Sequence, residues 1–207
     1  TQILEAISSP SGAEIAGFLI GPGELNAQLA GGTARANPIV LSVSEGKMAV
    51  TPQIVFSQNG SILSIDPGQV ADRIRISPRM CAGALQYIAP PLAGVATAEG
   101  TFSVEMEQCR IPLDAPEKGD LSGRMIIHAV SIGPGPMIRE LATALGFGKT
   151  AQLSRESVVP FRMVDGRVYH RDLELTFPEV TMKTYGSVGL DQSLALIVEM
   201  PIPDKWR

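Results

Sequence analysis

The sequence has few of the residues from which catalytic and metal sites are built. Its 207 residues include two cysteines, two histidines and one tryptophan, and aromatic residues make up 5% of the chain. No HxH, HExxH or CxxC spacing occurs, and these spacings are the usual signatures of zinc sites. We therefore predict no metal site and no cofactor.

Charge is also scarce, because Asp, Glu, Lys and Arg together make up 18% of the chain and the formal net charge is −4. A protein that binds nucleic acid usually carries a basic stripe, and none is visible, so nucleic acid is not an expected partner. No apolar run reaches the length of about 18 residues that a membrane-spanning helix needs. Because the sequence begins at Thr1 without a basic or apolar leader, we interpret it as a single domain, residues 1–207, excised from a longer chain. Membrane association would then come only from segments outside it.

The two cysteines, Cys81 and Cys109, leave two alternatives open. They can be two buried free thiols, because a free cysteine packs like a small apolar residue. They can also form one disulfide if the compartment is oxidising. One pair in a chain of this length does not make a disulfide framework.

Glycine and proline, by contrast, are plentiful, with 21 and 16 residues. This composition favours many short elements separated by turns over a helix bundle. The strongest pattern lies in residues 159–201, where apolar and polar residues alternate along several short segments. Alternation with a period of two predicts half-buried strands. Asp165-Gly166 supplies a two-residue hairpin turn.

Similar alternation starts at Pro38, with turns expected at Glu45-Gly46 and Asn59-Gly60. Ser77-Pro78 is typical of a helix start, and it predicts a helical segment near residues 78–95. A second helical segment is predicted near residues 134–147, where Met137, Ile138, Leu141 and Leu145 form an apolar stripe.

The first 37 residues carry weaker signals. Ile3, Leu4 and Ile7 have helical spacing, and Glu24 to Leu29 could form one or two helical turns. The run from Ile15 to Ile20 fits either a strand or a helical turn.

These segments predict an α+β fold that is mainly β. We expect a curved, largely antiparallel sheet of about ten short strands, with two or three helices packed on one face. Residues 43–50, VSEGKMAV, resemble residues 163–170, MVDGRVYH, because each has an acidic-Gly turn followed by a basic and an apolar residue. This similarity predicts an internal duplication of β units at 38–76 and 158–201.

The terminal meander also resembles a known family. Asp165-Gly166, the step Gly186-Ser187-Val188 and Leu190-Asp191 match the carboxy-terminal region of AsmA-like proteins, which are related to TamB-type and bridge-like lipid-transfer proteins. The resemblance covers roughly 45 residues well and residues 38–76 loosely. It implies a periplasmic or cell-envelope location and an apolar β groove for lipid acyl chains. It carries structural positions and no catalytic residues.

Apolar residues on one side of the terminal strands are the candidates for lipid contact, with ordinary core packing as the alternative. They share the period-two spacing of a single sheet face. These candidates are Phe161, Met163, Leu173, Leu175, Phe177, Val180, Met182, Leu194, Leu196 and Val198.

Catalytic alternatives are weak in this sequence. His128 and His170 lie within strand patterns, and Cys81 at a helix start is surrounded by core-like residues. Asp165 and Asp172 are better explained as a turn residue and a solvent-facing strand residue than as glycosidase carboxylates.

We therefore expect a non-enzymatic envelope domain that binds lipid or forms part of a lipid-transport or membrane-assembly protein. A purely structural or protein-interaction domain with a closed apolar core is the alternative, and a hydrolase is a remote one. The packing of the two helical segments distinguishes the first two, because helices that seal the sheet leave no groove.

Overall fold

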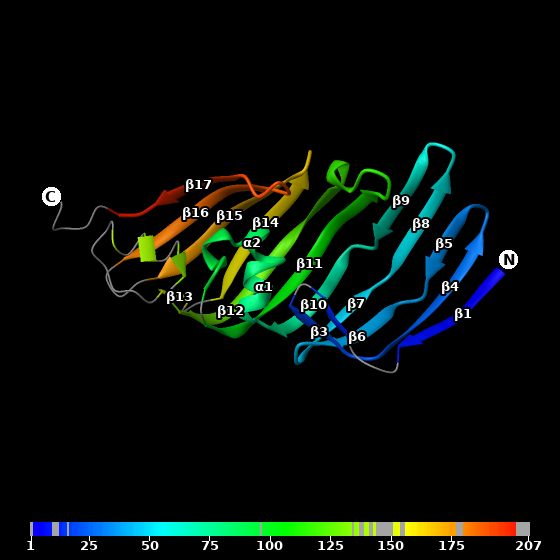
Figure 1. Ribbon diagram of the computed structural model, residues 1–207, viewed down its shortest axis with the longest axis horizontal. Helices are drawn as coiled ribbons and strands as arrows, with labels where there is room; N and C mark the ends of the chain where they lie inside the picture. The colour runs from blue at the N-terminus through cyan, green and yellow to red at the C-terminus, as the bar shows by residue number, and fades with distance from the viewer. Residues whose placement is uncertain are drawn as a thin grey trace.

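In a computed structural model the chain is an elongated, twisted antiparallel sheet with short helices on one side (Figure 1). The sheet has 17 strands in the part of the chain that the structure describes. The described residues are 2–9, 13–15, 17–95, 97–133, 135–136, 139–140, 143, 151–153, 156–176 and 180–201.

The N-terminal half of the sheet consists of long ribs, each made of two strands in line with a short break between them. β9 (Gly60–Ile65) and β10 (Gly68–Arg75) both pair antiparallel with β11 (Ala98–Pro112), so they are two parts of one rib. The preceding ribs are β3 (Phe18–Ile20) with β4 (Gly23–Ala30), β5 (Thr33–Ala36) with β6 (Ile39–Val43), and β7 (Gly46–Val50) with β8 (Pro52–Ser57). β1 (Gln2–Ser9) pairs with β4, and β2 (Ala13–Ile15) pairs with β3.

A proline stands at the break in each of these ribs. Pro22, Pro38 and Pro67 lie between the two strands of their ribs, and Pro52 begins β8 directly after Thr51. Proline has no backbone N–H and fixes φ, so it interrupts the hydrogen-bonded ladder at that point. The breaks therefore lie where the sequence removes a ladder donor.

The C-terminal half continues the meander with longer strands. β12 (Asp120–Ile132) pairs with β11 on one side, and with β13 (Ala151–Leu153) and β14 (Ser157–Val164) on the other. β15 (Arg167–Thr176), β16 (Thr181–Gly189) and β17 (Leu194–Glu199) follow in sequence, each paired with the strand before it. β1 and β17 lie at opposite ends of the molecule, so the sheet is open (Figure 1).

The segment between β10 and β11 is helical, as the sequence predicts. Ser77 caps α1 (Pro78–Ala82), and its hydroxyl accepts a hydrogen bond of 3.3 Å from the Met80 amide. α2 (Leu85–Ile88) and the 3₁₀ turn η1 (Pro90–Leu92) follow, and a second 3₁₀ turn, η2 (Pro116–Lys118), lies in the β11–β12 loop. None of the helices among the described residues has the length and apolar character that crossing a membrane requires.

The predicted helix near residues 134–147 falls mostly outside the described residues. Pro136, Arg139, Glu140 and Thr143 are helical, and the Arg139 amide donates to the Gly135 carbonyl oxygen at 2.9 Å. The residues of the predicted apolar stripe are not among the described ones; they are Met137, Ile138, Leu141 and Leu145.

The hydrophobic core lies between one face of the sheet and the helical segment 78–95. Met80, Cys81, Leu85 and Leu92 are at most 3% exposed and belong to the same buried cluster as sheet residues such as Phe102. α2 contacts β15 and β16 directly. We call the face that carries this cluster the inner face and the opposite one the outer face.

Two sequence predictions about secondary structure were wrong. The sheet has more strands than the ten or so expected, because proline breaks divide the ribs. Residues 24–29 belong to strand β4 and residues 3–7 belong to strand β1, so neither segment forms helical turns. In β4 the partly buried Leu25, Ala27 and Leu29 alternate with exposed Asn26 and Gln28, and this period of two decides for a strand.

The hairpin turns bear on the predicted duplication. Asp165 and Gly166 both have positive φ, at 49° and 70°, as a type I′ turn requires. In the upstream copy the loop is Ser44-Glu45, with φ of 44° and 68°, and Gly46 already pairs with Val43. The turn therefore lies one position earlier than the predicted Glu45-Gly46, so the two loops do not align, and the duplication stays a prediction.

Candidate functional site: an apolar sheet face

An unbroken line of apolar residues crosses the inner face from β4 to β17. Residues that pair directly across strands project from the same face, so the pairing register traces the line. From β4 to β11 the directly paired residues are Leu29, Ala34, Ile54, Leu63 and Ile111. Two positions along β11, on the same face, Cys109 takes up the line. From there the paired residues are Leu121, Met163, Val168, Val188 and Leu194.

The helices cover only part of this face. Figure 1 shows α1 and α2 in front of the central strands, whereas no helix of the described residues lies over β4, β5, β8 and β9. Accordingly, Met163, Val168 and Val188 are buried, while Leu29, Ile54 and Leu63 are only half-buried. Phe56, which is two residues from Ile54 in β8, is 48% exposed. The N-terminal half of the inner face is thus apolar and partly exposed.

The outer face is crossed by ion pairs between neighbouring strands. Arg124 lies 2.7 Å from Glu105, Lys183 lies 3.0 Å from Glu174, and Arg162 lies 3.3 Å from Asp120. Solvent weakens exposed pairs of this kind, so each contributes little to stability. The outer face also exposes apolar side chains, among them Val55, Val158 and Ile197, so it carries both charged and apolar groups.

The predicted lipid-contact residues separate into two groups. Phe161, Met163, Leu173, Leu175, Val180 and Met182 are at most 8% exposed and belong to the core cluster. On the last strand, Leu194 is 49% exposed, whereas Leu196 and Val198 are partly buried. Phe177 lies outside the described residues. A lipid-contact role for these positions stays a prediction, and the buried group serves as core.

The half-buried residues of the open N-terminal half were missed by the sequence reasoning. Leu29, Ile54 and Leu63 lie in strands that the sequence shows weakly or splits at prolines. The alternation of Leu25, Ala27 and Leu29 has the period of a strand, and it could have identified Leu29 as a residue on one sheet face.

His170 is the most unusual polar residue of the inner face. It lies opposite Phe161 and Gly186 and is 1% exposed, and neither ring nitrogen has a hydrogen-bond partner among the described residues. Burial disfavours the charged imidazolium and lowers the pKa of His170 to about 4. The ring is therefore neutral at neutral pH and adds bulk to the core.

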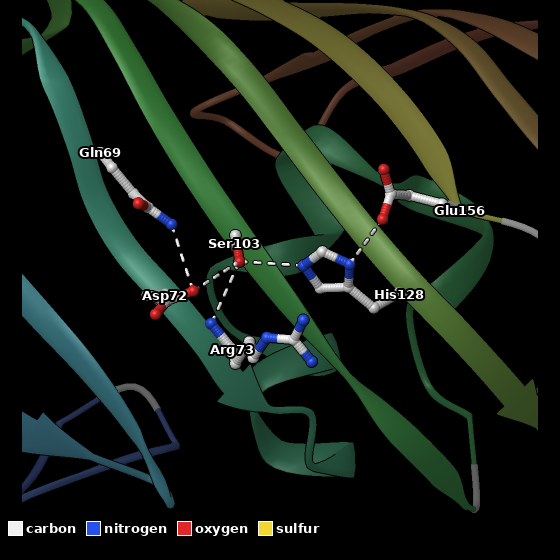
Figure 2. A network of polar contacts seen from close by, with 6 residues as sticks. All are labelled: Gln69, Asp72, Arg73, Ser103, His128 and Glu156. Atoms are coloured by element: carbon white, nitrogen blue, oxygen red, sulfur yellow. Dashed lines mark hydrogen bonds and ion pairs between the residues drawn. The ribbon is translucent and has the colours of Figure 1, made fainter.

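A polar network on the outer face connects β10, β11 and β12 with Glu156 just before β14 (Figure 2). The Ser103 Oγ lies 2.9 Å from His128 Nε2, and His128 Nδ1 lies 3.0 Å from Glu156 Oε2. This order of hydroxyl, imidazole and carboxylate is the one found in serine hydrolases. Sequence reasoning did not detect it, since the three residues are far apart in the chain.

The surroundings of Ser103 indicate a structural role for the network. Its Oγ accepts the Arg73 amide at 3.0 Å and also lies 3.4 Å from Asp72 Oδ1, and the residue is 2% exposed. Arg73 has φ of 46°, which a residue with a side chain rarely adopts, at an irregularity in the β10–β11 register. The hydroxyl therefore satisfies the amide of this bulge, and a substrate carbonyl has no access to it.

The two cysteines lie apart in the fold, Cys81 in α1 and Cys109 in β11, and both are free, buried thiols. Burial raises the pKa of Cys81 to about 11 and also raises the pKa of Cys109. Such thiols are poor nucleophiles at neutral pH. Among the described residues, no group of three or more His, Cys, Asp or Glu side chains could hold a metal ion.

The chain matches no protein-family model, no curated protein and no solved structure. The resemblance to AsmA-like proteins therefore rests on the sequence motifs alone.

Proposed function

We propose that this chain is a non-enzymatic part of a lipid-transport or membrane-assembly protein, and that the open N-terminal half of its inner face holds lipid acyl chains. The observation that carries the proposal is the half-buried apolar line through Leu29, Ile54 and Leu63, over which none of the described helices lies. Exposed apolar surface costs roughly 25 cal/mol per Å² in water, so this surface gains stability when an apolar ligand covers it.

The architecture supports the same role. A meander with an apolar line across its inner face forms an elongated surface along which a flexible chain can lie across many strands. The resemblance of residues 159–201 to AsmA-like proteins implies a similar groove, and with it a periplasmic or envelope location. A duplicated β unit would lengthen such a surface.

The chemistry of the polar residues supports a role without catalysis. The hydroxyl of Ser103 is buried and already accepts a backbone amide, and the thiols of Cys81 and Cys109 are protonated at neutral pH. His170, which lies on the inner face, is neutral and enclosed. None of these environments activates a nucleophile.

A closed structural or protein-interaction domain is the second candidate. The observation that favours it is the C-terminal half, where α1 and α2 bury Met80 and Leu85 against the sheet. If the same held for the whole inner face, no ligand surface would remain. The two candidates therefore differ in what happens at β4, β5, β8 and β9.

Mass spectrometry of lipids that copurify with the protein tests the proposal. The wild-type chain is expected to carry lipid, and Ile54→Asp is expected to lose most of it, because a carboxylate on the apolar face is incompatible with an acyl chain. Gln53→Asp is the matched control, since Gln53 is the neighbouring residue and faces the outer side. Absence of lipid from the wild type, or equal lipid in both variants, would contradict the proposal.

A further inference from the structure

A pocket of about 600 Å³ lies at one rim of the sheet, where the β2–β3 turn, the β6–β7 turn and the start of α1 meet. Its volume is in the range of about 300–1,000 Å³ that is typical of small-molecule sites. Leu19, Ile20 and Ile76 give it an apolar lining, and Ser42, Ser44 and Ser77 add hydroxyl-bearing residues.

The pocket also carries two ion pairs. Arg79 Nη1 lies 2.6 Å from Glu14 Oε1, and Arg75 Nη1 lies 2.8 Å from Glu45 Oε1. All four side chains are between 38% and 77% exposed, so solvent weakens both pairs. A guanidinium has five N–H donors, and each arginine therefore has donors left for a ligand.

The apolar lining is continuous with the core beneath the helices. Ile76 is 3% exposed and belongs to the core cluster, and Ile20 packs against that cluster. Gly17 lies so close to the Arg79 and Met80 backbone that a Cβ would overlap it, which fixes the β2–β3 turn against α1. The pocket thus joins charged groups at the rim to the apolar side of the sheet.

We propose that this rim pocket, formed by Glu14, Glu45, Arg75 and Arg79, binds the headgroup of a zwitterionic amphiphile, a phosphate next to a cationic amine. The assignment rests on the proposed lipid-binding function and specifies the class of lipid. The phosphate pairs with the arginines, which favour oxyanions with several acceptor oxygens, and the amine lies near the glutamates.

The balance of charge favours a zwitterion over a simple anion. The pocket contains as many glutamates as arginines, so a ligand that carries only a phosphate meets two carboxylates in addition to the guanidiniums. A ligand that carries only a cationic amine meets two guanidiniums in addition to the carboxylates. A head with both charges can pair with each sign at once.

Binding of four amphiphiles with the same twelve-carbon chain tests the assignment by isothermal titration calorimetry below their micelle concentrations. The probes are dodecylphosphocholine, dodecyl phosphate, dodecyltrimethylammonium and dodecyl maltoside. The wild-type chain is expected to bind dodecylphosphocholine most tightly. Arg75→Gln with Arg79→Gln is expected to weaken that binding about three- to tenfold, as lost exposed ion pairs do. Glu14→Gln with Glu45→Gln should weaken it too, but should strengthen binding of dodecyl phosphate.

Arg124→Gln is the matched control, because it removes an exposed, paired arginine from the outer face. It should leave all four affinities unchanged. Equal affinity for the four probes, unchanged by the pocket variants, would overturn the headgroup assignment and leave the proposed acyl-chain function standing. Tighter binding of dodecyl phosphate than of dodecylphosphocholine would also overturn it. Binding of none of the probes would overturn both.

Discussion

Phe161 and His170 lie opposite each other on β14 and β15, and both point into the core of the inner face. Among the described residues the imidazole has no hydrogen-bond partner at either nitrogen, and it is almost fully shielded from solvent. The imidazole of His170, which can be protonated, is therefore buried in the apolar core, where a positive charge is unfavourable.

Acidification should destabilise the fold through His170. Its pKa falls from an ordinary 6.5 to about 4 in the folded chain, so the unfolded state takes up the proton first. The contribution to stability is complete above pH 6.5 and is lost as the pH falls toward 4. Between pH 7 and pH 5 the loss is about 2 kcal/mol.

Urea unfolding at the two pH values measures this effect in the wild type and in His170→Leu. Between pH 7 and pH 5 the free energy of unfolding should fall by about 2 kcal/mol less in the variant than in the wild type. The carboxylates contribute equally to both proteins, so the difference reports His170. The same pH dependence in both proteins would show that His170 is not the group responsible.

Ser103→Ala should destabilise the fold by about 1–2 kcal/mol, because it leaves the Arg73 amide without its acceptor at the β10–β11 irregularity. Ser131→Ala is the control, as Ser131 lies exposed on the neighbouring strand β12. Chemical unfolding at neutral pH compares them. If Ser103→Ala were as stable as the control, the network in Figure 2 would not hold the bulge.

Met80→Ala should cost about 2–5 kcal/mol, because it removes a fully buried side chain and leaves a cavity between α1 and the sheet. Met106→Ala, at a half-buried position of β11, should cost clearly less. Thermal or urea unfolding of both variants gives the comparison. Equal losses would mean that α1 does not seal the inner face.

Sequence reasoning located the C-terminal half well, because its strands carry uninterrupted alternation and Asp165-Gly166 marks a turn unambiguously. It also placed the helix start at Ser77-Pro78, where the cap and the proline act locally. It also found the alternating strands from Pro38 onward, but it failed in the first 37 residues, where β1 and β4 were considered as helical turns. Local periodicity does not reveal that two short segments form one rib.

The candidate sites depend on contacts between distant parts of the chain, which a single sequence does not display. Leu63 and Ile111 become neighbours only through the β9–β11 pairing, although the helical segment and most of two strands separate them in the sequence. The rim pocket likewise joins Glu14 to Arg79. The apolar character of one face was predictable from alternation, whereas its partial cover by helices was not.

The most direct test of the central claim compares positions 54 and 53 in β8, which face opposite sides of the sheet. Ile54→Cys and Gln53→Cys are each labelled with bimane and titrated with a phospholipid that carries a nitroxide on its acyl chain. The native thiols are buried with raised pKa values and should label slowly, and unsubstituted protein measures that background. The label at position 54 should be strongly quenched and the label at position 53 should not. Equal quenching at both positions, or none at position 54, would contradict an acyl-chain surface on the inner face.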